Sequence, residues 1–490
     1  MTKYLLILVG SLFISITSFS SAFKVKFTEE VSKQAISGRL YLFLDSDTTK
    51  EVVPKVAWAN PKPFFSIDIT DWQPNQELII KDNLLSYPIN FEDLEENNYA
   101  IRALIDFNTN ERDFATEAGN AFSKTTIGYI SNKNDNLIDI TINQVILPRK
   151  FQEGKFIKEI TLKSELVSKF LGKPTYLKAG VVLPKSYFEK PEKKYPILYI
   201  IHGFGGNHYS TRRYAYMFQT REKIETIYVV LNAECPLGHH VFADSDNNGP
   251  WGKALTEEFI PYIEKKYRAI GETNARFVTG HSSGGWSSLW LQVTYPKVFG
   301  SVWSTAPDPV DLIEFTNINI YDSNDNFFYK NDTLKPVMRR NGKILLRLKA
   351  FSDMEVVLGD GGQMGSFEAV FSKRDESGRP EKLWNRKTGE LNISVAESWK
   401  RYDIRMILEN NWKKLKKDLE GKLHVYVGTV DNFYLEQGVM LLKESLGKLG
   451  SDAVIEFFPG RDHGTLLQAD LLDRIMQELQ ETFEENYPTK

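Results

Sequence analysis

The segment Gly280-His281-Ser282-Ser283-Gly284 places a serine between two glycines, with a predicted strand over 276–279 before it and a predicted helix over 283–294 after it. A sharp strand-to-helix turn brings stretches of backbone too close together for Cβ atoms, which favours glycine on both sides of the residue at its tip. The turn also lifts the hydroxyl of that residue clear of its surroundings. This pattern is typical of a nucleophile elbow, although an ordinary strand–helix turn fits the same five residues.

Two residues downstream could activate this serine. A serine hydroxyl is a poor nucleophile at neutral pH, and it needs an imidazole to take its proton and a carboxylate to fix the imidazole tautomer. Asp431 follows the apolar segment 423–427 and His463 follows the segment 455–458, so both are expected in loops just beyond strands. Asp431 could instead, or in addition, cap the helix that starts near Phe433. Asp462 is the rival acid, but adjacent side chains usually point apart.

Ester or amide chemistry at such a serine needs two backbone N–H donors for the oxyanion. One is expected at Ser283, at the start of the helix. The other is expected in the glycine-rich loop that follows the apolar segment 197–201, where we assign Phe204 as the donor and keep Gly203 as the alternative. The neighbouring histidines, His202 and His281, are expected to shape the backbone rather than to transfer protons.

A polar loop ahead of the helix predicted over 252–267 could border the mouth of the pocket. Asp244, Asn248 and Trp251, together with Asn247, are the substrate-binding candidates in this loop. A turn-rich surface loop with a packed tryptophan is an equally good interpretation of the same residues.

Composition limits the kind of protein and its compartment. The chain has 490 residues, 42% of them hydrophobic, and a formal net charge of −3, and it has no long basic block, which argues against a nucleic-acid partner. Cys235 is the only cysteine, so no intramolecular disulfide can form, and its place at a strand end predicts a packed side chain. Lys3, an apolar run over 4–16 and small residues up to Ala22 predict a cleaved signal peptide over 1–22, hence a secreted or periplasmic protein without membrane insertion.

The chain divides into two patterns of secondary structure. Residues 23–160 show short alternating strands separated by turn residues, which predicts a β-sandwich. Residues 161–490 show strands alternating with helices, which predicts a mostly parallel sheet with helices on both faces. Residues 306–421 interrupt this alternation, so we expect an inserted cap there, with a helical run over roughly 396–419.

The motifs together resemble a known family. The loop His202-Gly203-Phe204-Gly205-Gly206, the turn around Ser282 and the segment Arg461-Asp462-His463 are similar to those of the putative esterase family of α/β-hydrolases, which includes enterochelin esterases, esterase D, feruloyl and acetylxylan esterases, and mycolyltransferases. The resemblance covers about 170–487, minus the insertion. It implies the α/β-hydrolase fold and serine-dependent ester hydrolysis without a metal or organic cofactor. Some members carry an immunoglobulin-like N-terminal domain, which implies that form for the predicted sandwich.

These patterns predict an exported serine esterase that acts on a carboxylic ester of a carbohydrate, a siderophore or another small molecule. The catalytic residues would be Ser282, His463 and Asp431. Two alternatives stay open. The same triad could transfer the acyl group to an alcohol, or the hydrolase domain could be degenerate and the sandwich could bind carbohydrate through Trp58, Phe64, Phe65 and Trp72.

Overall fold

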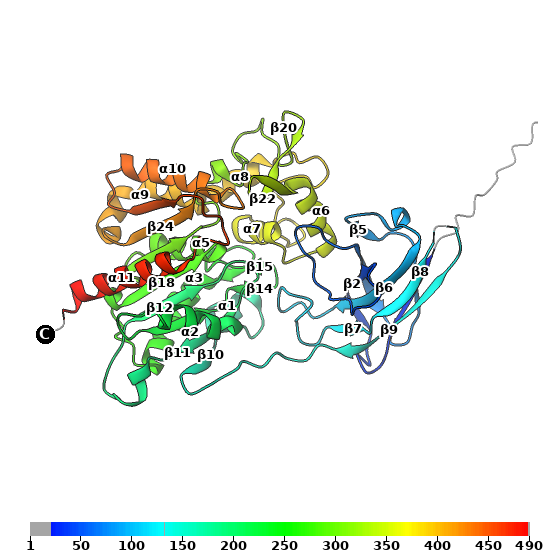
Figure 1. The fold of residues 1–490 in the computed structure, drawn as a ribbon, viewed down its shortest axis with the longest axis horizontal. Coiled ribbons are helices and arrows are strands. Elements are labelled where there is room, and N and C mark those ends of the chain that lie inside the picture. The colour runs from blue at the N-terminus through cyan, green and yellow to red at the C-terminus, as the bar shows by residue number, and fades with distance from the viewer. Residues whose placement is uncertain (1–20, 132, 489–490) are drawn as a thin grey trace, which may run out of the picture. The chain divides into compact units, whose positions relative to one another are not determined.

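The computed structural model describes residues 21–131 and 133–488, which form two compact units (Figure 1). Of the described residues, unit 1 contains 21–56, 61–107, 120–131 and 133–146. Unit 2 contains 57–60, 108–119 and 147–488. Residues 1–20 of the expected signal peptide lie outside the described part of the chain.

Unit 1 is all β. Its described strands form one sheet in the order β4-β1-β9-β7-β6-β2-β3-β5, with β8 also paired to β6. All pairings are antiparallel except that of β1 with β9. The strands are β1 (Ala22–Phe27), β2 (Ile36–Asp45), β3 (Phe64–Trp72), β4 (Leu78–Ile80), β5 (Leu85–Tyr87), β6 (Asn97–Asp106), β7 (Ala121–Ser123), β8 (Thr126–Ile130) and β9 (Leu137–Val145), with a short 3-10 turn at Phe91–Asp93.

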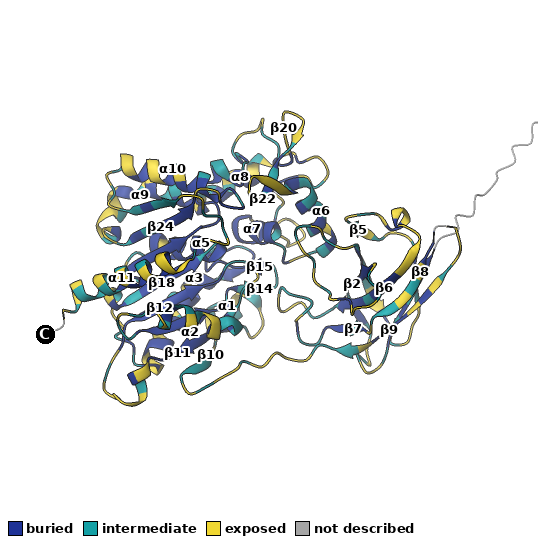
Figure 2. Cartoon of the chain, in the orientation of Figure 1, coloured by how far each residue is buried: buried dark blue, intermediate teal, exposed yellow. Residues whose placement is uncertain are grey.

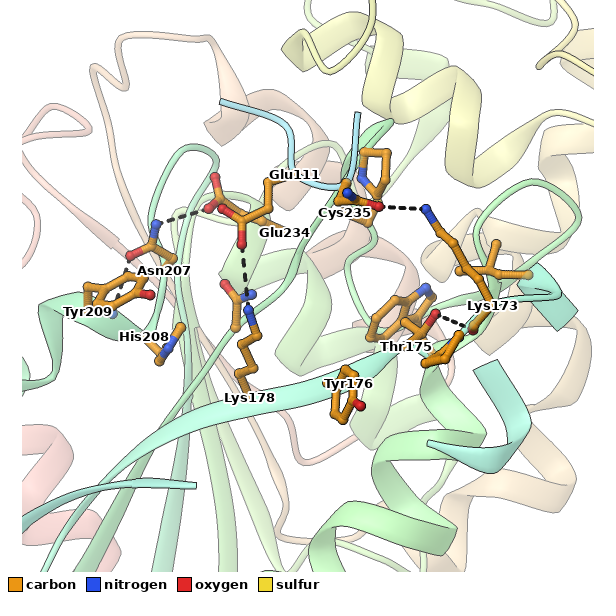
Figure 3. Close-up of a pocket in the computed structure, with 16 residues that line it drawn as sticks. Glu111, Lys173, Thr175, Tyr176, Lys178, Asn207, His208, Tyr209, Glu234 and Cys235 are labelled. Atoms are coloured by element: carbon orange, nitrogen blue, oxygen red, sulfur yellow. Dashed lines mark hydrogen bonds and ion pairs between the residues drawn. The ribbon is translucent and has the colours of Figure 1, made fainter. Parts of the chain in front are cut away.

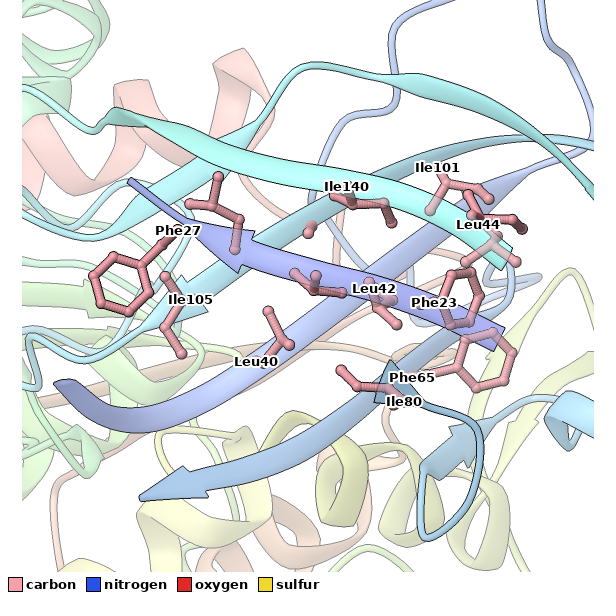
Figure 4. Packing of buried hydrophobic residues seen from close by; sticks show 14 of the residues in the cluster. Phe23, Phe27, Leu40, Leu42, Leu44, Phe65, Ile80, Ile101, Ile105 and Ile140 are labelled. Atoms are coloured by element: carbon pink, nitrogen blue, oxygen red, sulfur yellow. The ribbon is translucent and has the colours of Figure 1, made fainter. Parts of the chain in front are cut away.

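The strands of unit 1 enclose a single apolar core, in which side chains from β1, β2, β3, β6 and β9 point toward one another (Figure 4). Phe64, Phe65 and Trp72 are all at most 1% exposed. These three aromatic rings therefore stabilise the unit by packing and present no face to a carbohydrate.

Unit 2 is built on an eight-stranded mixed sheet with the order β10-β11-β13-β12-β18-β19-β24-β25. The pairings of β11 with β10 and with β13 are antiparallel, and the other five are parallel. The central strands β12, β13 and β19 are fully buried, and β12 and β13 are near-continuous apolar runs, as expected of strands covered on both faces. The strands are β10 (Ile157–Lys163), β11 (Tyr176–Val182), β12 (Ile197–Ile201), β13 (Ile227–Leu231), β18 (Arg276–His281), β19 (Ser301–Thr305), β24 (Leu423–Gly428) and β25 (Val454–Phe458).

Helices cover this sheet on both faces. On one face, α2 and α11 pack together, and on the other α5 packs on β18 and β19 and contacts α9, which contacts α10 (Figure 1). Figure 2 shows α5 buried along its length, whereas α11 has one buried and one exposed face. The helices are α1 (Glu165–Leu171), α2 (Thr211–Gln219), α3 (Trp251–Lys253), a π-helical segment (Ala254–Phe259), α4 (Ile260–Lys266), α5 (Ser283–Thr294), α10 (Leu435–Lys448) and α11 (Ala469–Asn486).

The segment between β19 and β24 contains more than a cap. It forms two small hairpins and helices α6 to α8, and then α9, which packs against α5 and α10 as part of the sheet's helical cover. Asp403 begins α9 by accepting a hydrogen bond from Met406 N. The helical run expected over 396–419 is therefore divided, with α8 before Asp403 and α9 after it. The elements are β20 (Tyr329–Lys330), β21 (Thr333–Leu334), β22 (Pro336–Arg340), β23 (Lys343–Arg347), α6 (Leu348–Leu358), α7 (Gln363–Phe371), α8 (Ile393–Trp399) and α9 (Ile404–Leu419).

The boundary between the units lies earlier than the sequence pattern suggests. β10 pairs along its length with β11, so residues from 147 onward group with unit 2 and not with the all-β unit. In the sequence, Ile157–Lys163 resembles the short strands that precede it. Only its pairing with β11 shows that it belongs to unit 2. Among the described residues, no helix is long and apolar enough to cross a membrane.

Candidate active site

Ser282 lies at the tip of a tight turn between β18 and α5. Its backbone has φ 61° and ψ −126°, a conformation that non-glycine residues rarely adopt, and its N–H donates to Thr305 O. A Cβ on Gly280 would lie 2.0 Å from Gly284 O, and one on Gly284 would lie 2.1 Å from Ile201 O. Both glycines are therefore required by close backbone approach, as the pattern predicted.

Replacing Gly284 by alanine is expected to destabilise the protein by about 3 kcal/mol or more, because backbone atoms and not flexible side chains occupy the space of the new methyl group. The measurement is urea unfolding. The matched control is Gly447→Ala in α10, where a Cβ meets nothing within 4 Å and alanine should stabilise the helix by up to about 1 kcal/mol. Equal effects of the two substitutions would contradict this description of the turn.

Asp431 and His463 are joined at the ends of neighbouring parallel strands, β24 and β25. Asp431 is fully buried, and its Oδ2 lies 2.8 Å from His463 Nδ1. Its Oδ1 accepts a hydrogen bond from Phe433 N at 2.8 Å, whereas helix α10 begins only at Leu435. The carboxylate therefore fixes its own loop and the imidazole, and it does not cap the helix.

The rival acid, Asp462, does not orient the imidazole. Its Oδ1 accepts hydrogen bonds from the backbone N–H and the hydroxyl of Thr465 in the same loop. Adjacent side chains point apart here, as expected.

The surroundings of His463 favour its charged form. Burial lowers the pKa of His463, but the charge and hydrogen bond of Asp431, with smaller contributions from Asp308 and Asp462, raise it above its ordinary value. The ring of His281 lies 4.5 Å away between centroids, and its Nδ1 is 3.1 Å from Thr305 Oγ1. Burial, followed by the charge of His463, lowers the pKa of His281 well below its usual range, so His281 stays neutral and supports its neighbour by packing.

The hydroxyl of Ser282 is directed at a third acid. Its Oγ lies 3.5 Å from Asp308 Oδ1, and within the described part of the chain it makes no hydrogen bond with His463. Asp308 Oδ2 accepts a 2.5 Å hydrogen bond from Ser283 Oγ and a 3.3 Å one from Gln363 Nε2. Burial raises the pKa of Asp308 to about 6, against the lowering effect of the Ser283 hydrogen bond. The structure thus brings Asp431 and His463 together and places Asp308, which the sequence did not single out, beside Ser282.

Two backbone N–H groups near Ser282 are available to an anion. Neither Phe204 N nor Ser283 N donates to an acceptor within the described residues. The loop that carries Phe204 passes close to the elbow, because a Cβ on Gly203 would lie 3.1 Å from both His281 O and Ser282 Cβ. The ring of Phe204 lies under the guanidinium of Arg112, 4.6 Å from its centroid. His202 is buried and hydrogen-bonded to Ser210, and burial lowers its pKa to about 3, which suits a structural role.

Ser282 opens into a cavity of about 40 Å³ whose walls are mostly apolar and whose polar end is formed by Asp308 and Gln363. The other lining residues are Trp58, Pro309, Thr316, Val337, Phe351, Met364, Phe367, Phe433 and Leu435. The ring of Trp58 lies 4.9 Å from that of Phe351 and 5.8 Å from that of Phe433. Asp308 could have been found as a carboxylate directly after a buried strand, whereas Trp58 lies too far away in the sequence for any local signal.

The substrate-binding candidates from the sequence lie in unit 2, outside the cavity at Ser282. Asp244 accepts hydrogen bonds from Lys253 N and Tyr295 Oη. Trp251 stacks on His240 with ring centroids 4.0 Å apart and donates to Asn248 O at 2.8 Å. None of Asp244, Asn248 and Trp251 lines the cavity at Ser282; they lie in and beside the small hairpin of β16 (Asp244–Ser245) and β17 (Gly249–Pro250).

A second, more polar cavity of about 210 Å³ lies away from Ser282 (Figure 3). Its charged side chains have polar partners: Glu234 accepts a hydrogen bond from Asn207, and Lys178 lies 3.6 Å from Glu111. Cys235 also lines it, but the thiol is buried and burial raises its pKa to about 12, so Cys235 is unreactive, as its sequence position predicted.

Comparisons with solved structures and with family models find several similar proteins. The chain is similar to the solved structures of a ferulic acid esterase (17% identity, TM-score 0.41, covering 68% of this chain and 100% of that one) and of an S-formylglutathione hydrolase from Agrobacterium tumefaciens (14%, 0.41, 68% and 97%). It is also similar to a CE1 ferulic acid esterase from Anaeromyces mucronatus (18%, 0.33, 68% and 94%). No curated protein matches.

The comparison with family models identifies the family. The model of the family described as "Putative esterase" matches residues 173–440, which is more than half of the chain and includes Ser282, Asp308 and Asp431. The chain therefore belongs to the Putative esterase family and has its α/β-hydrolase fold.

Proposed function

We propose that this protein is a serine esterase that hydrolyses a carboxylic ester through Ser282, His463 and Asp431. The observation that carries the proposal is the 2.8 Å pair of Asp431 and His463 beside a strained serine turn. Family membership supports ester hydrolysis. The N–H groups of Phe204 and Ser283, which have no acceptor within the described residues, support an oxyanion site beside Ser282.

The proposed reaction begins with a rotation of the Ser282 side chain about its Cα–Cβ bond, away from Asp308 and toward His463. His463 Nε2 takes the hydroxyl proton while Oγ bonds to the ester carbon, and the carbonyl electrons move to an oxygen held by Phe204 N and Ser283 N. The C–O bond to the alcohol then breaks, and His463 returns the proton to the departing oxygen. Water, deprotonated by His463, attacks the acyl-enzyme, and the acid leaves as Ser282 regains its proton.

The setting of the enzyme is part of the proposal. The apolar run near the N-terminus supports export to the periplasm or beyond, where esters of carbohydrates, siderophores or other small molecules are the candidate substrates. We propose that unit 1 is an immunoglobulin-like sandwich, which its antiparallel pairings and single core support.

The test is a turnover screen of the mature protein against short-chain aryl esters, acetylated xylan, feruloylated sugars and catecholate siderophores. Ser282→Ala is the background control. Hydrolysis that is lost in this variant supports the proposal. If no ester is hydrolysed, or if the variant is as active as the parent, the proposal is wrong.

The rate should depend on pH through His463, which must be neutral to accept the serine proton. Because its pKa is raised above the ordinary value of about 6.5, kcat/KM should be highest above this raised pKa and fall tenfold per pH unit below it. The measurement is kcat/KM for an uncharged ester between pH 5 and 9, after subtraction of the Ser282→Ala rate. A profile whose acid limb has its midpoint below 6 would contradict the raised pKa.

A further inference from the structure

Asp308 is a buried carboxyl group without a counter-ion. It is 6% exposed, it follows β19 between Pro307 and Pro309, and no lysine, arginine or histidine within the described residues forms a salt bridge with it. Buried carboxylates are usually paired with a cation or saturated with hydrogen bonds, because their desolvation is otherwise unfavourable. Asp308 is therefore an exception that calls for a function.

The two oxygens of Asp308 differ in how well they are bonded. Oδ2 accepts hydrogen bonds from Ser283 Oγ and Gln363 Nε2, which fix the carboxyl plane. Among the described residues, Oδ1 has a hydrogen-bond donor only in Ser282 Oγ, 3.5 Å away, and this contact is lost when the hydroxyl turns toward His463. In the reacting enzyme, Oδ1 would face the cavity with unused capacity to accept a hydrogen bond.

Apart from Ser282 Oγ, the ester carbon carries the carbonyl oxygen, the alcohol oxygen and the acyl chain. The directions of these three groups determine where the acyl chain lies relative to Oδ1. The carbonyl oxygen points to Phe204 N and Ser283 N, and the alcohol oxygen leaves beside His463. The acyl chain must take the remaining direction, into the cavity that Ser282 shares with Asp308 and Gln363. An atom attached to the α-carbon lies about 3 Å from Oγ by bond lengths alone. Because Ser282 and Asp308 line the same small cavity, such an atom can approach Oδ1 to hydrogen-bonding distance.

We propose that Asp308 is a specificity-determining residue that binds a hydrogen-bond donor, a hydroxyl or an ammonium group, on the α-carbon of the acyl group. This inference rests on the proposed esterase function and names the acyl part of its substrate. The cavity of about 40 Å³ holds roughly three water-sized groups, which suits an α-carbon with a donor and a methyl-sized substituent. The aromatic side chains of Trp58, Phe351 and Phe433 form apolar walls, which exclude a charged group from the remainder of the acyl chain.

The charge of Asp308 should make this preference depend on pH. The titratable groups that act on Asp308 are His463, which lowers its pKa, and Asp431, which raises it, while burial is the largest effect and brings the value to about 6. The carboxylate is therefore present above about pH 6 and lost below it. The preference for an α-ammonium group should weaken below that pH, whereas an α-hydroxyl can still hydrogen-bond to the protonated carboxyl.

The experiment compares phenyl esters of propionate, lactate, alanine and methylmalonate, which carry hydrogen, hydroxyl, ammonium and carboxylate on the same α-carbon. For each ester, kcat/KM of the intact enzyme is divided by that of Asp308→Asn, so that the intrinsic reactivity of the ester cancels. The propionate ratio reports any general effect of the substitution. We expect the alanine ratio to exceed it by about 10- to 100-fold and the lactate ratio by about 10-fold. The methylmalonate ratio should fall below the propionate ratio because two carboxylates repel each other.

Two further readouts separate the possible failures. A substituent that must reach Oδ1 fixes the hand of the α-carbon, so one enantiomer of the alanine ester should be preferred by the intact enzyme and this preference should shrink in Asp308→Asn. Equal ratios for all four esters would overturn the inference while leaving the esterase function intact. Absence of Ser282-dependent hydrolysis of the propionate ester as well as the others would overturn the proposed function itself. A correctly folded variant is verified by a melting temperature close to that of the parent.

Discussion

Replacement of Ser282 by alanine is expected to lower kcat by about a millionfold, because the nucleophile of an acyl-enzyme reaction has no substitute in its site. The polar neighbours of Ser282 cannot take its place: Ser283 Oγ is bonded to Asp308, and His281 is neutral and packed. The measurement is steady-state hydrolysis of phenyl propionate together with labelling by a fluorophosphonate probe. Labelling should disappear with activity.

The control for this result is the stability of the variant. The alanine replacement removes only a 3.5 Å hydrogen bond, so the melting temperature should stay within a few degrees of the parent's. Labelling that survives in a folded Ser282→Ala protein would remove this serine from the mechanism.

Replacement of Asp431 by asparagine should lower kcat by about ten-thousandfold while keeping the fold. The asparagine can still occupy the loop and accept from Phe433 N, but it cannot hold the imidazole in the tautomer that leaves Nε2 free to accept a proton. The loss of the adjacent negative charge should also lower the pKa of His463. Hydrolysis of phenyl propionate and an NMR titration of the imidazole measure the two effects.

The chain offers a matched control in Asp462→Asn. This carboxylate is next to His463 in sequence but bonds to Thr465, so its replacement should change kcat only severalfold. If Asp462→Asn is as damaging as Asp431→Asn, the assignment of the orienting acid is wrong.

The sequence predicted those parts of the fold and site that local patterns specify. Glycine spacing around Ser282 required the turn that the structure contains, and apolar runs located β24 and β25, with Asp431 and His463 directly after them. Parallel strands end at one edge of a sheet, so residues far apart in sequence were expected to converge there. The pairing of Asp431 with His463 follows from this rule.

The features of the fold and site that the sequence did not predict depend on long-range packing. The α-helical run over 396–419 divides because Asp403 begins a new helix, and the second piece packs against α5 and α10 instead of joining a cap. Trp58 reaches the cavity at Ser282 from a distant part of the chain. The hydroxyl of Ser282 faces Asp308 and not His463, a choice between side-chain rotamers that no sequence pattern encodes.

The positive φ of Ser282 has an evolutionary consequence. A backbone conformation of this kind costs about 1–3 kcal/mol for any residue with a side chain, and glycine would adopt it more readily. Selection for thermal stability alone would therefore tend to replace Ser282 by glycine. Serine in place of glycine at this position therefore lowers the stability of the fold, and the hydroxyl that the proposed reaction uses is what the protein gains in return.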